Sequence, residues 1–127
     1  MTTTILNIED VQPMTIPTHG PKHQVRKMYE MRDLGVFHST MLAGCELPHE
    51  VHQCDEVILR LSGNAIIKVD ERIHTSGPEV ASVIPAGTWH QSSSAEPDDS
   101  VKQIVLLAYS QAEGSILDAV LDAIAVD

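Results

Sequence analysis

The sequence predicts an all-β domain, a sandwich or barrel of short strands, and three observations support this fold class. Apolar stretches of roughly five to eight residues recur between turns that contain Gly, Pro or Asn. Several stretches alternate apolar with polar residues, which is the period of a half-buried strand. The chain has 127 residues, 43% of them hydrophobic, which suffices for one domain with its own core. That core must be mostly aliphatic, because aromatic residues make up only 3% of the chain.

Residues 1–23 are expected to form an N-terminal arm. The prolines in this segment exclude a helix through residues 13–21, because proline removes a backbone donor and restricts the residue before it. A short strand is expected around residues 5–8. His19 and His23 flank a Gly-Pro turn, and we expect both imidazoles to be exposed to solvent.

Residues 24–109 are expected to form the barrel. Short apolar or alternating runs predict strands at residues 24–31, 36–42, 56–61, 65–69, 80–84 and 101–109. Residues 70–72 are expected at the tip of a polar hairpin. Residues 92–100 are rich in Ser, Asp and Glu, so we expect a polar loop there.

Residues 110–127 show a different period. Apolar side chains recur at the spacing of one helix face, at Ile116, Leu117, Val120, Leu121 and Ile124. On each side of Gly114 a serine is followed three positions later by an acidic residue, which resembles a helix-capping pair. We therefore expect one C-terminal α-helix over residues 110–127, packed on the barrel or on a second subunit of a homodimer.

Composition limits the partners of this chain. Eighteen acidic residues against eight basic ones give a net charge of −10, which argues against binding nucleic acid or an anionic membrane surface. No segment approaches the roughly 20 apolar residues that span a bilayer. Residues 1–7 lack the features of a secretory signal, so we expect a cytoplasmic protein. Cys45 and Cys54 are expected to be buried thiols.

Nitrogen and oxygen donors are concentrated in one short stretch, which contains His49, Glu50, His52, Asp55 and Glu56. A further histidine, His90, follows a Pro-x-Gly turn. Residues i and i+2 of a strand share a face, so Glu50 and His52 point together while His49 points away unless the strand bulges. Two imidazoles with one or two carboxylates suit a single divalent ion, and the set does not distinguish Fe, Mn, Ni, Co and Zn.

The spacing of these residues resembles the cupins, small β-barrel proteins recognised by two short motifs. The first motif is Gly, five residues, His-x-His, three or four residues, Glu, six residues and Gly. It matches from Gly44 to Gly63, with Glu50 in place of the first histidine. The second motif is Gly, five to seven residues, Pro-x-Gly, two residues, His, three residues and Asn. It matches from Gly77 to Ser94, with serine in place of the final Asn.

This resemblance implies a cupin-type double-stranded β-helix, or jelly-roll barrel, with His52, Glu56 and His90 as metal ligands. At the place of the missing histidine it implies Glu50, either as a fourth ligand or, when not bound to the metal, as a general base. His49 is the reserve candidate for the fourth position, since a kink in the backbone would turn it inward. Cupins include dioxygenases, decarboxylases, isomerases, lyases, storage proteins and ligand-sensing domains, so the fold does not fix the reaction.

The function expected from these features is that of a metal-dependent enzyme acting on a small molecule. One divalent ion per chain would polarise a carbonyl or enol(ate) substrate, in a dioxygenase or in an isomerase or lyase. Two alternatives stay open: a ligand-binding or structural cupin module without catalysis, and a solvated loop at residues 49–56 without a site. Elsewhere, Trp89 is expected in the core or a dimer interface, and His38 and His74 on the surface or in hairpins.

Overall fold

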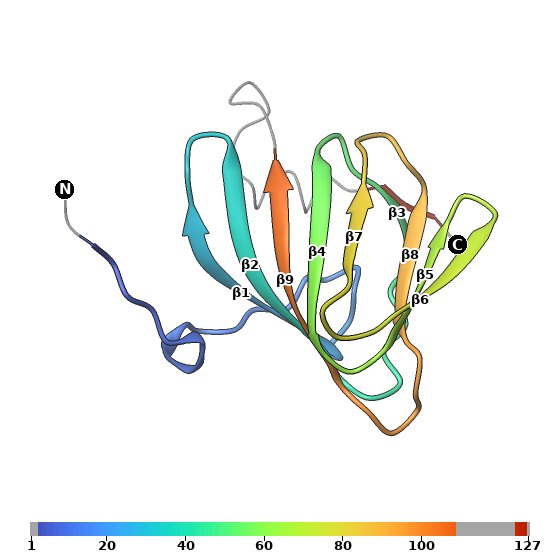
Figure 1. Cartoon of the computed structure of the whole chain (residues 1–127), viewed down its shortest axis with the longest axis horizontal. Helices are drawn as coiled ribbons and strands as arrows, with labels where there is room; N and C mark the ends of the chain where they lie inside the picture. Colours follow the sequence, from blue (N-terminus) through green and yellow to red (C-terminus); the bar gives the residue numbers. More distant parts are fainter. Residues whose placement is uncertain (1–2, 109–123, 127) are drawn as a thin grey trace.

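The computed structural model describes residues 3–108 and 124–126, which form two five-stranded antiparallel sheets facing each other (Figure 1). The first sheet contains, in order, β1 (His23–Glu30), β2 (Leu34–Met41), β9 (Val101–Ala108), β4 (Asp55–Ser62) and β7 (Ala81–Ile84). The second sheet contains, in order, β10 (Ile124–Val126), β3 (His49–Val51), β8 (His90–Ser94), β5 (Ala65–Val69) and β6 (Arg72–Ser76). The all-β prediction is confirmed.

The predicted strands correspond to β1, β2, β4, β5, β7 and β9, with ends that agree within about two residues. The prediction of a polar loop over residues 92–100 was wrong at its start, because Ser92, Ser93 and Ser94 belong to β8. This strand is polar and yet partly buried. Its polar side chains are tolerated because they find partners, as when Gln91 donates through Nε2 to the carbonyl of Leu47 at 2.9 Å.

The N-terminal arm has no strand at residues 5–8, and its first regular element is the 3₁₀-helix η1 (Ile8–Asp10). Further along, the arm folds back onto the barrel. Met14 and Val25 exchange two backbone hydrogen bonds of 2.8 Å, and Ile16 is buried. The prolines therefore exclude regular structure, but they do not keep the arm away from the core.

The predicted C-terminal helix does not extend to its predicted end. Residues 124–126 form strand β10, which pairs antiparallel with β3 so that Ala125 faces Glu50. A short strand such as β3 leaves backbone groups unpaired at its edge, and β10 supplies their partners. Residues 109–123, on which the rest of the helix prediction falls, lie outside the described residues.

The core between the sheets is aliphatic, with Phe37 as its aromatic member among the described residues. Cys45 and Cys54 are buried, as predicted, in two different clusters of this core. Trp89 is 44% exposed and therefore does not belong to it. The expectation for His38 was also wrong, because its side chain is buried between neighbouring strands of the first sheet.

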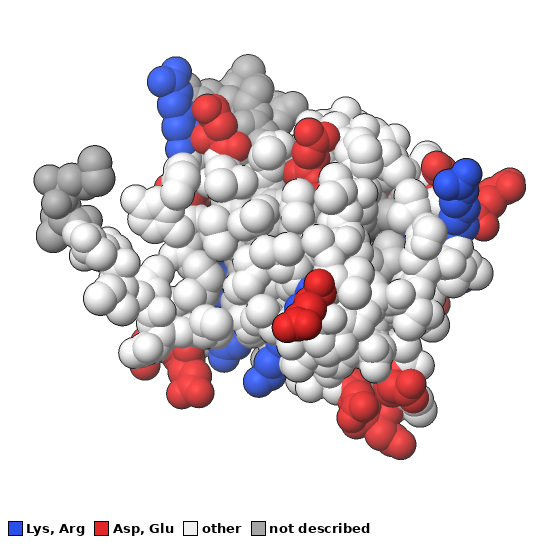
Figure 2. Space-filling view, viewed as in Figure 1, with Lys and Arg blue, Asp and Glu red and all other residues white. Residues whose placement is uncertain are grey.

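Many of the acidic side chains, which outnumber the basic ones in the sequence, lie on the surface. Figure 2 shows acidic side chains mainly towards the margins of one face, while most of its middle is neither acidic nor basic. Across the part of the chain that the structure describes, no helix has the length and hydropathy needed to cross a membrane.

Candidate metal centre

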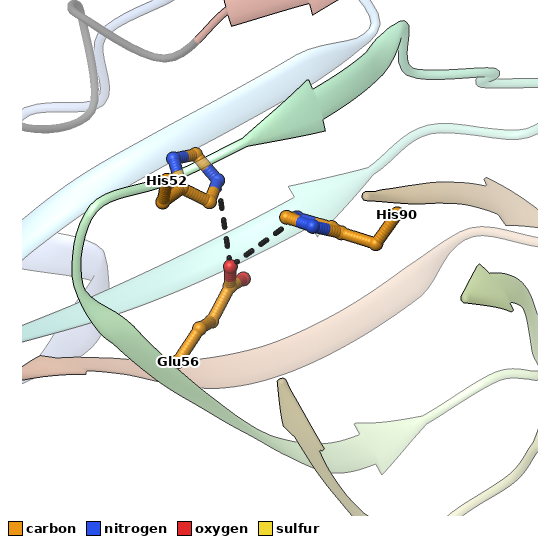
Figure 3. A group of neighbouring side chains, drawn as sticks. All are labelled: His52, Glu56 and His90. Carbon is orange, nitrogen blue, oxygen red and sulfur yellow. Dashed lines mark ion pairs between the residues drawn. The ribbon is translucent and has the colours of Figure 1, made fainter. Parts of the chain in front are cut away.

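Three buried donors from separate parts of the sequence meet between the two sheets. His52 directly follows β3, Glu56 is the second residue of β4, and His90 opens β8. Figure 3 shows both imidazoles directed at the same carboxylate. One ligand atom from each residue can be chosen so that all three lie within 4.8 Å of one another. The sequence motifs therefore identified residues that the fold brings together.

Backbone contacts between two turns hold this arrangement. The amide of Gly87 donates to the carbonyl of His52 at 2.8 Å, and the amide of Ala86 donates to Oδ1 of Asp55 at 2.8 Å. The Pro-x-Gly turn before His90 is thereby fixed against the turn that carries His52. Asp55, one of the clustered carboxylates, thus serves as an acceptor that joins the two turns.

The distances among the donors match those around a metal ion. Oε2 of Glu56 lies 3.5 Å from Nε2 of His52 and 3.5 Å from Nε2 of His90. Two ligands of a tetrahedral ion with bonds of about 2.0–2.2 Å lie about 3.3–3.6 Å apart. The same oxygen has no hydrogen bond of good geometry in spite of its burial. Two imidazole nitrogens at this distance from one carboxylate oxygen, with all three ligand atoms within 4.8 Å of one another, fit a shared cation.

The tautomer of His90 also fits a metal ligand. Its Nδ1 lies 3.0 Å from the carbonyl oxygen of Thr88, which can only accept, so Nδ1 carries the hydrogen. In the neutral ring, Nε2 then presents its lone pair to Glu56 and His52. Metal-bound histidines commonly have their other ring nitrogen held in this way.

The pKa values of the two imidazoles are shifted in opposite directions. Burial opposes the charged form of His90, but the hydrogen bond and charge of Glu56 outweigh it and raise the pKa of His90. Burial dominates at His52 and lowers its pKa in spite of Glu56 and Glu50. Burial alone would raise the pKa of Glu56, but the neighbouring histidines lower it, so this carboxylate is ionised at neutral pH.

Glu50 reaches the same cavity but is not part of the group of three. It faces His90 across the β3–β8 pair and is only 4% exposed. Its Oε2 lies 3.9 Å from Nε2 of His52, and its Oε1 lies 2.7 Å from Nε2 of His19. His49, the reserve candidate, is half-buried, precedes Glu50 on β3 and is not among the residues that line the cavity.

Two histidines of the arm belong to this cavity, contrary to the expectation that they are exposed. The side chain of His19 is 5% exposed and His23 is 6% exposed. His23 was within reach of sequence reasoning, because it lies two residues before the buried Val25 on the same face of β1. The burial of His19 depends on how the arm folds back, and no local pattern reports that.

The cavity itself is mainly apolar. Together with its solvent-filled mouth it encloses about 680 Å³ of empty space. Its apolar wall is formed by Met14, Ile16, Val25, Phe37, Leu47, Ile58, Val105 and Leu107. Its described lining includes no lysine or arginine, and its polar part is the histidine and glutamate group together with Ser39, Ser92 and Gln103.

No family model matches the sequence, and no curated protein is similar enough in sequence to count as a relative. The fold does have close counterparts among solved structures. The polyketide cyclase RemF from Streptomyces resistomycificus has a TM-score of 0.77 at 17% identity, over 84% of this chain and 80% of that chain.

Two further structures show the same likeness. An RmlC-like cupin from Shewanella frigidimarina NCIMB 400 has a TM-score of 0.74 at 14% identity, over 87% of this chain and 94% of that one. A predicted oxalate decarboxylase from Thermotoga maritima has a TM-score of 0.73 at 8% identity, over 84% and 99%. Identities this low show the fold alone. The chain has the fold of the cupin superfamily, as its two motifs predicted.

Proposed function

We propose that this protein is a metal-dependent enzyme that transfers a proton on an uncharged, largely apolar carbonyl or enol compound, as an isomerase, cyclase or lyase. The observation that carries this proposal is the buried group of His52, Glu56 and His90 at the wall of an apolar cavity. These three residues would hold one divalent ion. When bound, that ion supplies Lewis acidity, which polarises a carbonyl and stabilises the enolate that forms on loss of a proton.

Glu50 is the proposed general base. Its carboxylate lines the cavity beside the metal-binding group, and one of its oxygens points toward His52. A base must lie within hydrogen-bond reach of the proton that it removes. The position of Glu50 supports this role for a substrate whose oxygen is held at His52, Glu56 and His90. Its strand pairs with that of His90, and its Oε2 lies 3.9 Å from Nε2 of His52.

The charge of the cavity favours an uncharged substrate. The two carboxylates of Glu50 and Glu56 together balance a divalent ion, and the described lining offers no lysine or arginine to an anion. A keto-acid or sugar acid would bring a further negative charge into a buried site without a counter-ion, which is costly. A neutral diketone or enol would not.

The wall of the cavity agrees with this substrate class. Eight aliphatic, thioether or aromatic side chains form the wall, so most of the substrate must itself be apolar. One structure of the same fold is a polyketide cyclase. That likeness supports an oxygenated organic substrate by analogy of fold only.

The first test is the metal itself. Elemental analysis of the purified protein should find about one divalent ion per chain, and His52→Ala, Glu56→Ala and His90→Ala should each lose it. His74→Ala is the matched control, since His74 is exposed on the β5–β6 hairpin and should leave the metal content unchanged. Protein that binds no metal under any loading condition would leave a ligand-binding or structural module as the function.

The second test is turnover. Deuterium incorporation and isomerisation should be followed by NMR with neutral diketones and enols against keto-acids of matched size. We expect turnover of the neutral compounds alone, and Glu50→Gln should lower kcat by roughly 10²–10⁴-fold while the metal remains bound. Oxygen consumption in step with substrate loss would instead identify a dioxygenase. Saturable binding without turnover would contradict the enzyme proposal.

A further inference from the structure

A line of buried polar contacts runs from Glu50 across the interior of the barrel. His19 Nε2 lies 2.7 Å from Glu50 Oε1, and His19 Nδ1 lies 2.8 Å from His23 Nδ1. His23 Nε2 lies 2.7 Å from Ser39 Oγ, which also accepts from Nε2 of Gln103 at 3.2 Å. The 2.7 Å contact between His19 Nε2 and Glu50 Oε1 is an ion-pair contact that does not have the geometry of a hydrogen bond in this structure.

The chemistry of the end groups fixes the direction of every hydrogen bond when both rings are neutral. A carboxylate at Glu50 can only accept, so His19 donates through Nε2–H and its Nδ1 must accept. The hydrogen between the two rings then belongs to Nδ1 of His23. Nε2 of His23 accepts in turn, so the hydroxyl of Ser39 donates to it.

The surroundings of the second ring support this assignment. Burial first, and then the neighbouring His19, lower the pKa of His23 to about 3. His23 is therefore neutral at physiological pH, and a neutral imidazole offers one donor and one acceptor. This is the combination that a relay between Ser39 and His19 requires.

The far end of the line lies on two paired strands of the first sheet. Ser39 is on β2 and stands opposite Gln103 on β9, at the centre of the first sheet. Glu50 is on β3 in the second sheet. The two arm histidines thus connect the carboxylate to a rigid strand on the other side of the cavity, and neither cupin motif contains them.

We propose that His19 is a positioning residue for Glu50: it occupies one carboxylate oxygen and leaves the other directed at His52, while His23 and Ser39 fix the tautomer of His19. This deepens the proposed function and rests on it only for the role of Glu50 as the base. The arm is accordingly part of the active site. Without His19, a carboxylate that is 4% exposed loses a close donor and turns away from the position needed for proton transfer.

Histidine tautomers test the geometry without any substrate or metal. Long-range ¹H–¹⁵N spectra of the full-length protein, metal-free and loaded with Zn²⁺, should show Nε2–H for His19 and Nδ1–H for His23. Ser39→Ala should move the ring resonances of both histidines, whereas Ser82→Ala on β7, a half-buried serine away from the cavity lining, should not. The opposite tautomer at His19, or unmoved resonances in Ser39→Ala, would overturn the proposal.

Kinetics test the consequence for Glu50. His19→Ala should lower kcat by roughly 10–100-fold with little change in KM or metal content, and His19→Gln should restore part of the loss because its amide can still donate. A wild-type kcat in His19→Ala would contradict the positioning role. The two experiments distinguish failure of this proposal from failure of the proposed function. The predicted tautomers without turnover of any substrate would refute the proposed enzyme but leave the hydrogen-bonded line intact.

Discussion

At the scale of single residues, the surroundings of Glu56 are those of a carboxylate that could bind a cation. Its carboxylate is buried and one oxygen faces two imidazoles at 3.5 Å without a well-formed hydrogen bond. Buried ionic groups of this kind contribute little to stability unless further partners satisfy them. Apolar residues of similar volume would pack more easily at these positions. A cation bound by all three would give these polar groups the partner that they lack.

The lowered pKa of His23 predicts that the protein loses stability in acid. Because its folded pKa of about 3 lies below the ordinary value of 6.5, its stabilising contribution is complete above pH 6.5 and is lost as pH falls toward 3. Between pH 7.5 and pH 5 this group alone should cost about 2 kcal/mol of unfolding free energy. Urea unfolding of metal-free protein at both pH values should show this loss in the wild type. In His23→Gln, the difference in unfolding free energy between the two pH values should be smaller by about 2 kcal/mol.

His74→Gln serves as the control for that measurement, because it makes the same replacement at an exposed histidine on β6. The comparison concerns the change between the two pH values and not the absolute stability, so a general destabilisation by the substitution does not disturb it. An equal loss in wild type and His23→Gln would mean that His23 is not held neutral by burial.

Some residues of the site can be predicted from local sequence patterns, and others depend on tertiary contacts. His52, Glu56 and His90 were predictable because motif spacing reports turns and strand faces, which are local. His19 was not, since its burial depends on the arm meeting β1 through the Met14–Val25 pair. Glu50 lines the cavity, but its contact with His19 could not be predicted from the sequence.

At the scale of elements, the first motif ends in a glycine that the packing requires. Gly63, in the turn between β4 and β5, has a φ of 79°, and a Cβ added there would lie 2.3 Å from the carbonyl oxygen of Ser100. Gly87, in the turn before His90, has the same φ of 79° but nothing within 4 Å of its added Cβ. The two motif glycines therefore share a backbone conformation and differ in their surroundings.

This pair gives a matched prediction. Gly87→Ala should cost roughly 1–2 kcal/mol, which is the strain of a left-handed residue with a side chain. Gly63→Ala should cost clearly more, because backbone atoms of the Ser100–Val101 segment must also move. Urea denaturation at neutral pH measures both. Equal costs would show that this segment yields freely, and that the glycine is needed for its φ angle alone.

The strands missed by sequence reasoning share a physical cause. β8 and β6 contain few apolar residues, so alternation gives a weak signal, and their pairing with β5 decides the structure. Residues 124–126 were assigned to a helix by apolar period, yet the open edge of β3 takes them as β10. The predicted strands were those whose own apolar pattern matched their position in the sheets.

At the scale of the whole molecule, the group of His52, Glu56 and His90 also connects the two sheets. Glu56 belongs to the first sheet and His90 to the second, and His52 lies in the turn that joins β3 to β4. A cation held by all three would tie the two layers together. Binding to the folded state alone must then stabilise the entire domain, because the unfolded chain does not bring these donors together.

The size of that stabilisation follows from mass action. At a free metal concentration 100 times its Kd, the folded state gains about 2.7 kcal/mol, which for a domain of this length raises Tm by roughly 10 °C. Thermal unfolding with and without Zn²⁺ should show this rise in wild type and lose it in His52→Ala, Glu56→Ala and His90→Ala. His49→Ala should retain it, because His49 precedes Glu50 on β3 and does not line the cavity. A rise that survives His90→Ala would place the ion on one sheet only, and a cation there could not link the layers or sit opposite Glu50.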